Sequence, residues 1–339
     1  GAVQKTKKDV VSTVIALKPT DFRGLVPKLL VKEGDEVLCG TPVLADKASP
    51  EILFTSPVSG TVEAVVRGEK RKLLEVRIKP DAEQKHLDFG AKKVNDLKDA
   101  DIRAILLKSG LWPSFIQRPY GILANPQARP KAIFVSAFST APLAANMEYV
   151  LRNETDNIQT GINAVVNLTD GGVHLCLCSD NLNGTPFHKL ENVIFHTFSG
   201  KHPAGNVGIE IHNIDPIRKG ETVWTISLLM LAAIGKLLNT GKLDLSRKVA
   251  VTGPKAIDPC YVNTVPGMAI ADIAEFYDNS ANDIRFISGD VLTGKNVGAE
   301  GFLGFYDNQV TLIREGNEFE MFGWAKPFRT HLFSASRAY

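Results

Sequence analysis

Residues 31–62 read VKEGDEVLCGTPVLADKASPEILFTSPVSGTV, and this stretch decides the fold of the first part of the chain. Short apolar runs alternate there with turn residues such as Gly34 and Pro42. Glycine and proline between short apolar runs favour strands joined by tight turns. Because the pattern extends over residues 24–79, we predict a β-rich first domain over residues 1–80.

The same pattern resembles the lipoyl and biotinyl barrel-sandwich family, in which two similar half-motifs face each other. In lipoyl domains, a lysine within an Asp-Lys-Ala hairpin carries the cofactor, and Lys47 has that context here. The segment from Lys47 to Pro57 is longer than in those carriers and contains bulky Ile52, Leu53 and Phe54, which argues against recognition by a ligase. A hairpin lysine is otherwise a solvated charge. A lipoyl-type carrier modified at Lys47 is therefore an alternative interpretation.

The middle of the chain alternates between apolar strand-like and helix-like segments. Residues 81–130 are predicted to be a connecting segment with a helix over residues 96–109. Residues 131–244 are predicted to form a Rossmann-like α/β domain with a mostly parallel sheet that is covered on both faces. The predicted strands cover residues 132–136, 173–178 and 193–198. The predicted helices cover residues 143–151, 153–168 and 221–238, and the last is apolar nearly all round, which indicates burial.

The third part of the chain changes character again. Residues 245–315 contain three strand-like runs and a helix near residues 270–276, and they resemble the soluble-ligand-binding β-grasp (SLBB) module. Further strands are predicted at residues 310–314 and 319–324, within a C-terminal segment over residues 316–339. The predicted fold class is therefore a multidomain α+β protein.

A glycine-rich loop follows the strand over residues 193–198. Its glycines allow positive φ angles and the close approach of a ligand, and loops at strand ends are common positions for sites in α/β proteins. Polar side chains fall close together here, namely those of His196, Lys201, His202 and His212. The alternative is an ordinary surface loop with solvated histidines.

Composition excludes several classes of function. The net charge of +2 in 339 residues gives no electrostatic case for binding nucleic acid. The four cysteines lack metal-type spacing, so we predict no structural zinc or iron–sulfur site. The longest apolar run, residues 226–234, is far shorter than the roughly 20 residues of a membrane span, and no signal peptide is visible. These features favour a cytoplasmic protein.

The order of the three modules and three short motifs identify a family. The motifs are FSGKHPAG at residues 198–205, SGDVLTG at residues 288–294 and FGWA at residues 322–325. Nearly the whole chain resembles the A subunits (NqrA family) of the sodium-translocating NADH:quinone oxidoreductases. The resemblance implies a peripheral, cofactor-free subunit on the cytoplasmic side of the bacterial inner membrane, attached through partner subunits that hold the flavins, the iron–sulfur centre and the NADH site. It also implies a possible quinone contact, and a largely helical C-terminal domain beyond residue 339.

The same module order resembles the flavin-binding subunit of respiratory complex I. In those relatives, Ser-Gly-Leu opens a glycine-rich loop that holds flavin mononucleotide. Here the Ser-Gly-Leu at residues 109–111 is followed by Trp112 and Pro113, where a phosphate cradle needs free backbone N–H groups. We therefore expect the flavin and NADH sites to be lost, and a flavin- or NADH-binding subunit is a second alternative.

For quinone binding, the glycine-rich loop would supply hydrogen bonds and nearby aromatic side chains an apolar wall, although each aromatic is more often simply core. No catalytic residue is assigned. The candidates for quinone or partner binding are Gly200, Lys201, His202, Pro203, Gly205, His212, Trp112 and Phe115.

Overall fold

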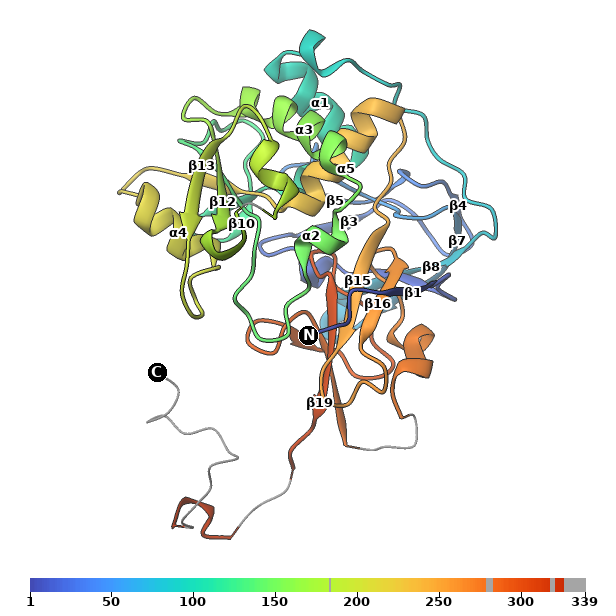
Figure 1. Ribbon diagram of the computed structural model, residues 1–339. Helices are drawn as coiled ribbons and strands as arrows, with labels where there is room; N and C mark the ends of the chain where they lie inside the picture. Colours follow the sequence, from blue (N-terminus) through green and yellow to red (C-terminus); the bar gives the residue numbers. More distant parts are fainter. Residues whose placement is uncertain (183, 279–282, 318–320, 326–339) are drawn as a thin grey trace.

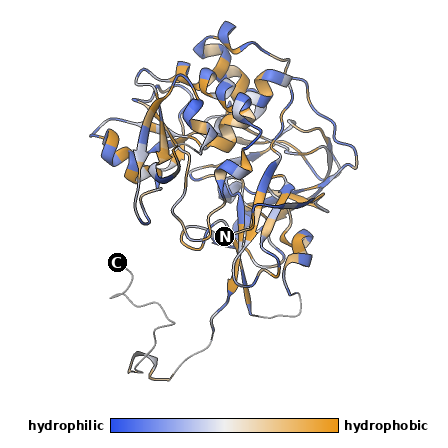
Figure 2. Ribbon diagram, viewed as in Figure 1, coloured by the Kyte–Doolittle hydropathy of each residue, from blue (hydrophilic) through white to orange (hydrophobic). Residues whose placement is uncertain are grey.

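The computed structural model describes residues 1–182, 184–278, 283–317 and 321–325. Four sheets and five α-helices lie within this part of the chain. The barrel-sandwich and β-grasp modules lie beside and below the α/β domain in the view of Figure 1. One hydrophobic core joins residues of all three modules, and the elements at the centre of the molecule have largely hydrophobic colours in Figure 2.

The first module is the predicted barrel sandwich of two small antiparallel sheets. One sheet has the order β2-β8-β7-β4, with β2 Ile15–Leu17, β8 Leu73–Pro80, β7 Gly60–Arg67 and β4 Glu36–Val37. The other has the order β3-β5-β6, with β3 Pro27–Leu29, β5 Pro42–Asp46 and β6 Leu53–Thr55. Gly34 and Gly40 have φ angles of 88° and 96°, which only glycine adopts without strain, and this explains the turn pattern of the sequence.

The second module contains a six-stranded sheet in the order β10-β9-β14-β11-β12-β13. Its strands are β9 Ile116–Arg118, β10 Ile122–Leu123, β11 Ile133–Ser136, β12 Val173–Cys178, β13 Ile194–Phe198 and β14 Val223–Thr225. Strands β14, β11, β12 and β13 pair in parallel, whereas β9 and β10 add antiparallel pairs. The segment 81–130, which we expected to be a connection, thus contributes two strands to this sheet as well as helix α1 Asp99–Ser109.

Two helices of this domain approach each other unusually closely. They are α3 Thr155–Val165 and α5 Leu228–Thr240. A Cβ atom at Gly161 would lie 2.2 Å from the carbonyl oxygen of Leu231, and one at Gly235 would lie 1.8 Å from that of Asn157. Glycine is therefore required at both crossing points, and the apolar helix α5 is buried as its composition predicts.

The third module is built on a six-stranded sheet in the order β1-β16-β15-β19-β17-β18. Its strands are β1 Thr6–Asp9, β15 Arg247–Thr252, β16 Cys260–Thr264, β17 Ile284–Ser288, β18 Lys295–Asn296 and β19 Gln309–Arg314. The N-terminal strand β1 pairs in parallel with β16, so the first residues of the chain complete the sheet of the last module.

Several predicted elements are shorter or different in the structure. The helix expected over residues 143–151 is only α2 Met147–Val150, because Leu143 has a φ of 61°, which no right-handed helix accommodates. The helix expected from residue 221 begins at Leu228, after strand β14, and the side chain of Ser227 accepts a hydrogen bond from the Met230 N–H as its N-cap.

Further corrections concern the loop and the C-terminal segment. Residues of the expected loop form the helix α4 Val207–Ile214, which carries His212. The helix expected over residues 270–276 is a kinked 3-10 helix. Of the strand expected over residues 319–324, the first two residues lie outside the described part of the chain, and residues 321–325 form a turn and a short 3-10 helix instead.

Candidate functional site

A cavity with a volume of about 760 Å³ lies where the three modules meet. Residues of the barrel sandwich line one side, including Cys39 and Val58, and helix α5 lines another. Strands β15 and β16 of the β-grasp module complete the wall. Cavities of roughly 300–1,000 Å³ are typical of small-molecule sites, and such sites often lie between domains.

The walls of this cavity are largely apolar. Its apolar lining residues are Val10, Val11, Ile15, Cys39, Pro57, Val58, Pro80, Ala82, Val150, Leu151, Leu229, Ala232, Ala233, Leu243, Leu245 and Val265. The thiol of Cys39 shares its proton between the carbonyl oxygens of Pro57 and Leu243, at 3.3 and 3.2 Å, and burial raises its pKa to about 12. Cys39 is therefore an inert wall residue rather than a nucleophile.

Two buried donors of the lining residues lack partners. The hydroxyl of Thr264 and the Nη2 atom of Arg247 have no hydrogen-bond partner among the described residues. The rest of the Arg247 guanidinium is fixed, because Nη1 donates to the Phe305 carbonyl at 2.9 Å. Burial lowers the pKa of Arg247 to about 10, so the group remains charged at neutral pH. Buried polar groups are nearly always hydrogen-bonded, so these two unpartnered donors are unusual. Both atoms are covered by neighbouring atoms, although their residues line the cavity.

Charged groups complete one part of the lining. The amine of Lys236 bridges Glu154 at 3.0 Å and Asp244 at 3.3 Å. Burial opposes its charge, but the two carboxylates outweigh this and raise the pKa of Lys236. Nearby, Lys248 donates to the Val150 carbonyl at 3.3 Å, and burial lowers its pKa. The cavity thus joins apolar walls to many polar and charged side chains, which make up about half of its lining residues.

The predicted glycine-rich loop lies elsewhere, beyond the end of β13. Lys201, His202, Pro203 and His212 are all exposed. The hydroxyl of Thr140 ties the loop to the segment after β11: it accepts a hydrogen bond from the Gly205 N–H at 3.0 Å and lies 3.2 Å from Nδ1 of His202.

The glycines of this loop serve different purposes. Gly200 has a φ of 122°, as expected for a position that only glycine tolerates. Gly205 does not need a positive φ; a Cβ there would lie 2.7 Å from the Thr140 nitrogen. Close approach of two loops, rather than of a ligand, explains Gly205.

A buried carboxyl group lies beside this loop. Glu210 of α4 is fully buried, and its Oε1 lies 2.7 Å from the hydroxyl of Ser136, which is also 3.0 Å from the Phe138 carbonyl. A hydroxyl cannot donate to both oxygens, so a protonated Glu210 that donates to Ser136 satisfies both. Burial raises the pKa of Glu210, in agreement with this arrangement.

Two histidines stack beside Glu210 on the same face of the sheet. Nδ1 of His174 lies 2.9 Å from Nε2 of His196, and the His174 ring stacks on Phe134 with centroids 4.6 Å apart. Burial lowers the pKa of both histidines, and His196 lowers that of His174 further. The pair therefore contains neutral rings.

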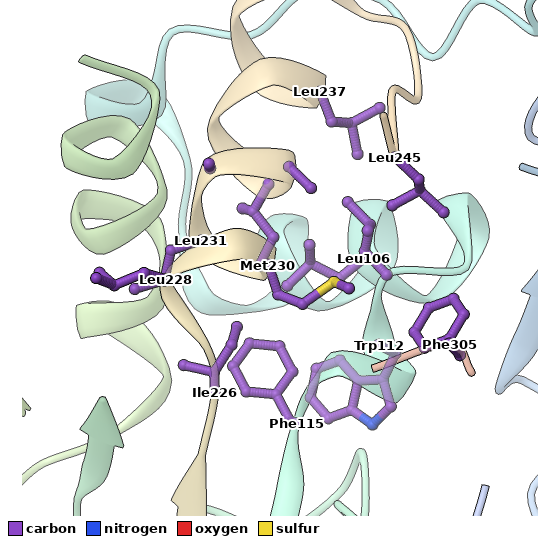
Figure 3. Close-up of a cluster of buried hydrophobic side chains, with 14 of the residues drawn as sticks. Leu106, Trp112, Phe115, Ile226, Leu228, Met230, Leu231, Leu237, Leu245 and Phe305 are labelled. Carbon is purple, nitrogen blue, oxygen red and sulfur yellow. The ribbon is translucent and has the colours of Figure 1, made fainter. Parts of the chain in front are cut away.

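The predicted aromatic wall is part of the hydrophobic core. Trp112 and Phe115 are both fully buried, and their rings pack against each other (Figure 3). Both rings also pack against Trp224. Neither residue lines the inter-module cavity. A Cβ at Gly110 would lie 2.3 Å from Oγ1 of Thr55, so the turn that holds flavin in the resembled family packs tightly against the barrel sandwich here.

The proposed carrier lysine is at a hairpin tip. Lys47 is exposed between β5 and β6, and its backbone N–H donates to the Val26 carbonyl at 2.8 Å. Ile52 and Phe54 are buried, which explains the bulky residues after the tip.

Sequence reasoning missed the inter-module cavity. Its lining residues come from positions between Asp9 and Val265, and only the tertiary fold brings them together. An arginine directly before an apolar predicted strand, Arg247, is the one local signal that could have pointed to it. Within the described residues, no cluster of three or more potential metal ligands is found, and no helix has the length and hydropathy of a membrane span.

Comparisons with known proteins agree with the fold. Residues 1–81 match the NqrA N-terminal barrel-sandwich hybrid domain, residues 97–243 the NqrA second alpha/beta domain, and residues 248–299 the NQRA C-terminal domain. Three similar proteins are each named as the A subunit of a Na(+)-translocating NADH-quinone reductase. That of Yersinia pestis bv. Antiqua is 37% identical, over 93% of this chain and 70% of the relative. Those of Rhodopirellula baltica and Haemophilus influenzae are 39% and 35% identical, over 96% and 95% of this chain and 72% of each relative.

The three modules in this order define a class of multidomain α+β subunits of an oxidoreductase complex. This chain belongs to the family of NqrA proteins, the A subunits of Na⁺-translocating NADH-quinone reductases. Both the resemblance and the α+β multidomain fold predicted from the sequence are confirmed.

Proposed function

We propose that this chain is a peripheral subunit of a sodium-pumping NADH:quinone oxidoreductase and that it binds quinone in the inter-module cavity. The observation that carries the proposal is the cavity of about 760 Å³ between the three modules, which offers an apolar surface and whose lining includes the polar residues Thr264 and Arg247. A quinone ring is apolar except for two carbonyl oxygens, and both oxygens accept hydrogen bonds. The names of the relatives supply the substrate, since each is called an NADH-quinone reductase subunit.

The apolar wall suits the remainder of such a molecule. Leu229, Ala232 and Ala233 of α5 line the cavity, and the small alanine side chains leave room along the helix. Burial of a hydrocarbon tail stabilises a complex by about 0.8 kcal/mol per CH₂ group. The ring would therefore be oriented by the donors, while the wall along α5 would supply most of the affinity.

Electrons would come from outside this chain. We propose that partner subunits hold the flavins, the iron–sulfur centre and the NADH site, and that they attach this subunit to the cytoplasmic side of the membrane. For the loop over residues 200–208, exposure of Lys201, His202 and Pro203 supports contact with such a partner better than quinone binding.

The two alternative functions have less support. A flavin-binding role needs a phosphate cradle, and the positions after Gly110 are occupied by core residues. A carrier role rests on Lys47 alone, which has the ordinary exposed position of a hairpin lysine.

A matched pair of variants tests the proposal. Thr264→Val removes the unpartnered hydroxyl of a residue that lines the cavity, and Ser114→Ala removes that of a residue that does not. We expect Thr264→Val to weaken binding of a short-tailed quinone to the isolated chain by roughly fivefold, consistent with the loss of about 1 kcal/mol for one hydrogen bond. Ser114→Ala should bind as the wild type does. Equal affinities for both variants, or photoreactive quinone crosslinked only outside the cavity, would exclude this site.

A further inference from the structure

We propose that strand β13 is a docking edge for another subunit of the complex, which adds an extended segment to its open side. This inference rests on the proposed function only in assuming assembly with partner subunits; it does not depend on the quinone site. The edge is defined here as β13 together with Lys201 beyond its end.

The first observation is an open and regular edge. β13 pairs with β12 on one side, in continuous parallel register from Ile194 to Phe198, without a bulge. No strand of the described residues pairs with its other side. β13 is thus the last strand of its sheet, and it lies beside α4 at the margin of the molecule (Figure 1). An edge strand of this kind can accept an added strand through its main-chain groups.

The second observation is that β13 lacks the features that protect edge strands. Native edges are usually short or carry charges, proline or bulges that prevent pairing with another chain. Here β1 carries Lys7 and Lys8, β3 begins with Pro27, and β18 contains Lys295. By contrast, β13 has the sequence Ile-Phe-His-Thr-Phe, and it is longer than any other edge strand that the structure describes. An unprotected edge of this length indicates that the strand has a partner.

The third observation is that apolar side chains are exposed on both faces of this edge. Ile194 is 46% exposed on the face that carries α4, and Phe195 is 41% exposed on the opposite face. Ile209 of α4 adds another exposed apolar side chain, at 38%. Neighbouring side chains of a strand point to opposite faces, so an added strand that lies along the edge can cover both Ile194 and Phe195 with its own alternating side chains.

Charge specifies the chemistry of the occupant. Lys201 is exposed and has no ion pair among the described residues. The neutral histidines 174 and 196 add no charge along the strand itself. The occupant is therefore an extended segment of a partner subunit with apolar side chains on both faces and a carboxylate at the end that reaches Lys201.

Assembly of the complex tests this inference. The chain would be co-expressed with the other subunits, with an affinity tag on one of those, and the amount of this chain retained would be measured. We expect Ile194→Lys and Phe195→Lys each to reduce retention at least fivefold. Lys201→Glu should reduce retention more at low salt than at high salt. The substitution replaces attraction to a carboxylate of the partner by repulsion, and salt screens both interactions. The matched control is Ile257→Lys, an exposed isoleucine (66%) in the β-grasp module, which should be retained like the wild type.

Two measurements keep the outcomes distinct. Melting of each isolated variant, which should match the wild type at these exposed sites, separates lost docking from lost folding. Quinone binding by the same isolated variants should be unchanged. The docking inference can therefore be tested even if quinone does not bind in the cavity. Wild-type retention of folded Ile194→Lys and Phe195→Lys would overturn the inference. A second result would also overturn the inference: the wild-type chain forms a dimer, and these variants are monomeric but assemble normally with the other subunits. The edge would then pair with a second copy of this chain.

Discussion

The hydroxyl of Tyr306 donates a hydrogen bond of 2.7 Å to the carbonyl oxygen of Pro113, and so joins the β-grasp module to the turn after α1. The same tyrosine ring contacts Phe22, which in turn packs against Phe54 of the barrel sandwich with centroids 4.5 Å apart. One chain of contacts therefore crosses all three modules. In this family member, the turn that would hold flavin is an interior joint between modules.

Tyr306→Phe should lower the free energy of unfolding by about 1–2 kcal/mol, because the buried Pro113 carbonyl loses its partner. Chemical denaturation measures the change, and Tyr120→Phe, at a tyrosine that is 67% exposed, is the control. If Tyr306→Phe unfolds at the wild-type midpoint, the hydrogen bond contributes nothing to the joint.

The purified chain should be colourless, because Trp112 and its neighbours fill the turn with core side chains. Trp112→Gly should not create a flavin site; loss of this buried ring should instead destabilise the fold by roughly 3–5 kcal/mol. Absorbance of the denatured supernatant measures released flavin. A yellow wild-type preparation would restore the flavin-binding alternative.

Lys47 should carry no lipoyl or biotinyl group in the native cell. Its hairpin is closed by buried Ile52 and Phe54 rather than extended as a free carrier loop. Intact mass of the protein isolated from its native cell measures this, with Lys47→Arg as the reference. A mass excess that disappears in the Lys47→Arg variant would favour the carrier alternative.

Most of the fold could be predicted because its elements have local signals. Val173–Cys178 is an apolar run of strand length, and the structure has a strand at those residues. The prediction failed at Val223–Thr225, because only two residues separate this short strand from the apolar helix α5, and the sequence therefore resembles one longer helix. Pairing with β11 and β9, which no local pattern reveals, decides that segment in favour of a strand.

The cavity could not be predicted for a related reason. Arg247 directly precedes a predicted strand and Thr264 belongs to another, and only the antiparallel pairing of β15 with β16 places the two residues opposite each other. Conversely, the glycine-rich loop was conspicuous in the sequence because two loops approach closely there, which is a structural requirement. A strong local sequence pattern can therefore reflect packing between loops, whereas a site assembled between modules has no local sequence pattern.

Glu210→Gln should stabilise the fold increasingly as pH rises. The pKa of Glu210 is raised in the folded state, so this carboxyl contributes stability below its unfolded pKa of about 4.5 and loses it as pH rises through the folded value. Glutamine keeps a hydrogen bond to Ser136 without an ionisable group. Denaturation at pH 5 and pH 8 should show a larger advantage of the variant at pH 8, and a difference independent of pH would contradict the buried neutral carboxyl.

The last prediction separates structure from function in the loop over residues 200–208. Gly205→Val should destabilise the fold, because its Cβ would come within 2.7 Å of the Thr140 nitrogen and 3.2 Å of the Phe138 ring. His202→Ala should leave melting nearly unchanged, since the side chain is exposed and such changes are usually within about 0.5 kcal/mol.

The assembled complex then decides what His202 does. We expect His202→Ala to weaken retention of this chain by its partners, or to slow quinone reduction through poorer assembly, while NADH oxidation by an artificial acceptor continues at the wild-type rate. Quinone binding by the isolated variant should be unchanged, because His202 does not line the inter-module cavity. If assembly, quinone reduction and the quinone KM all match the wild type, then the hydrogen bond between Thr140 and His202 only shapes an ordinary surface loop.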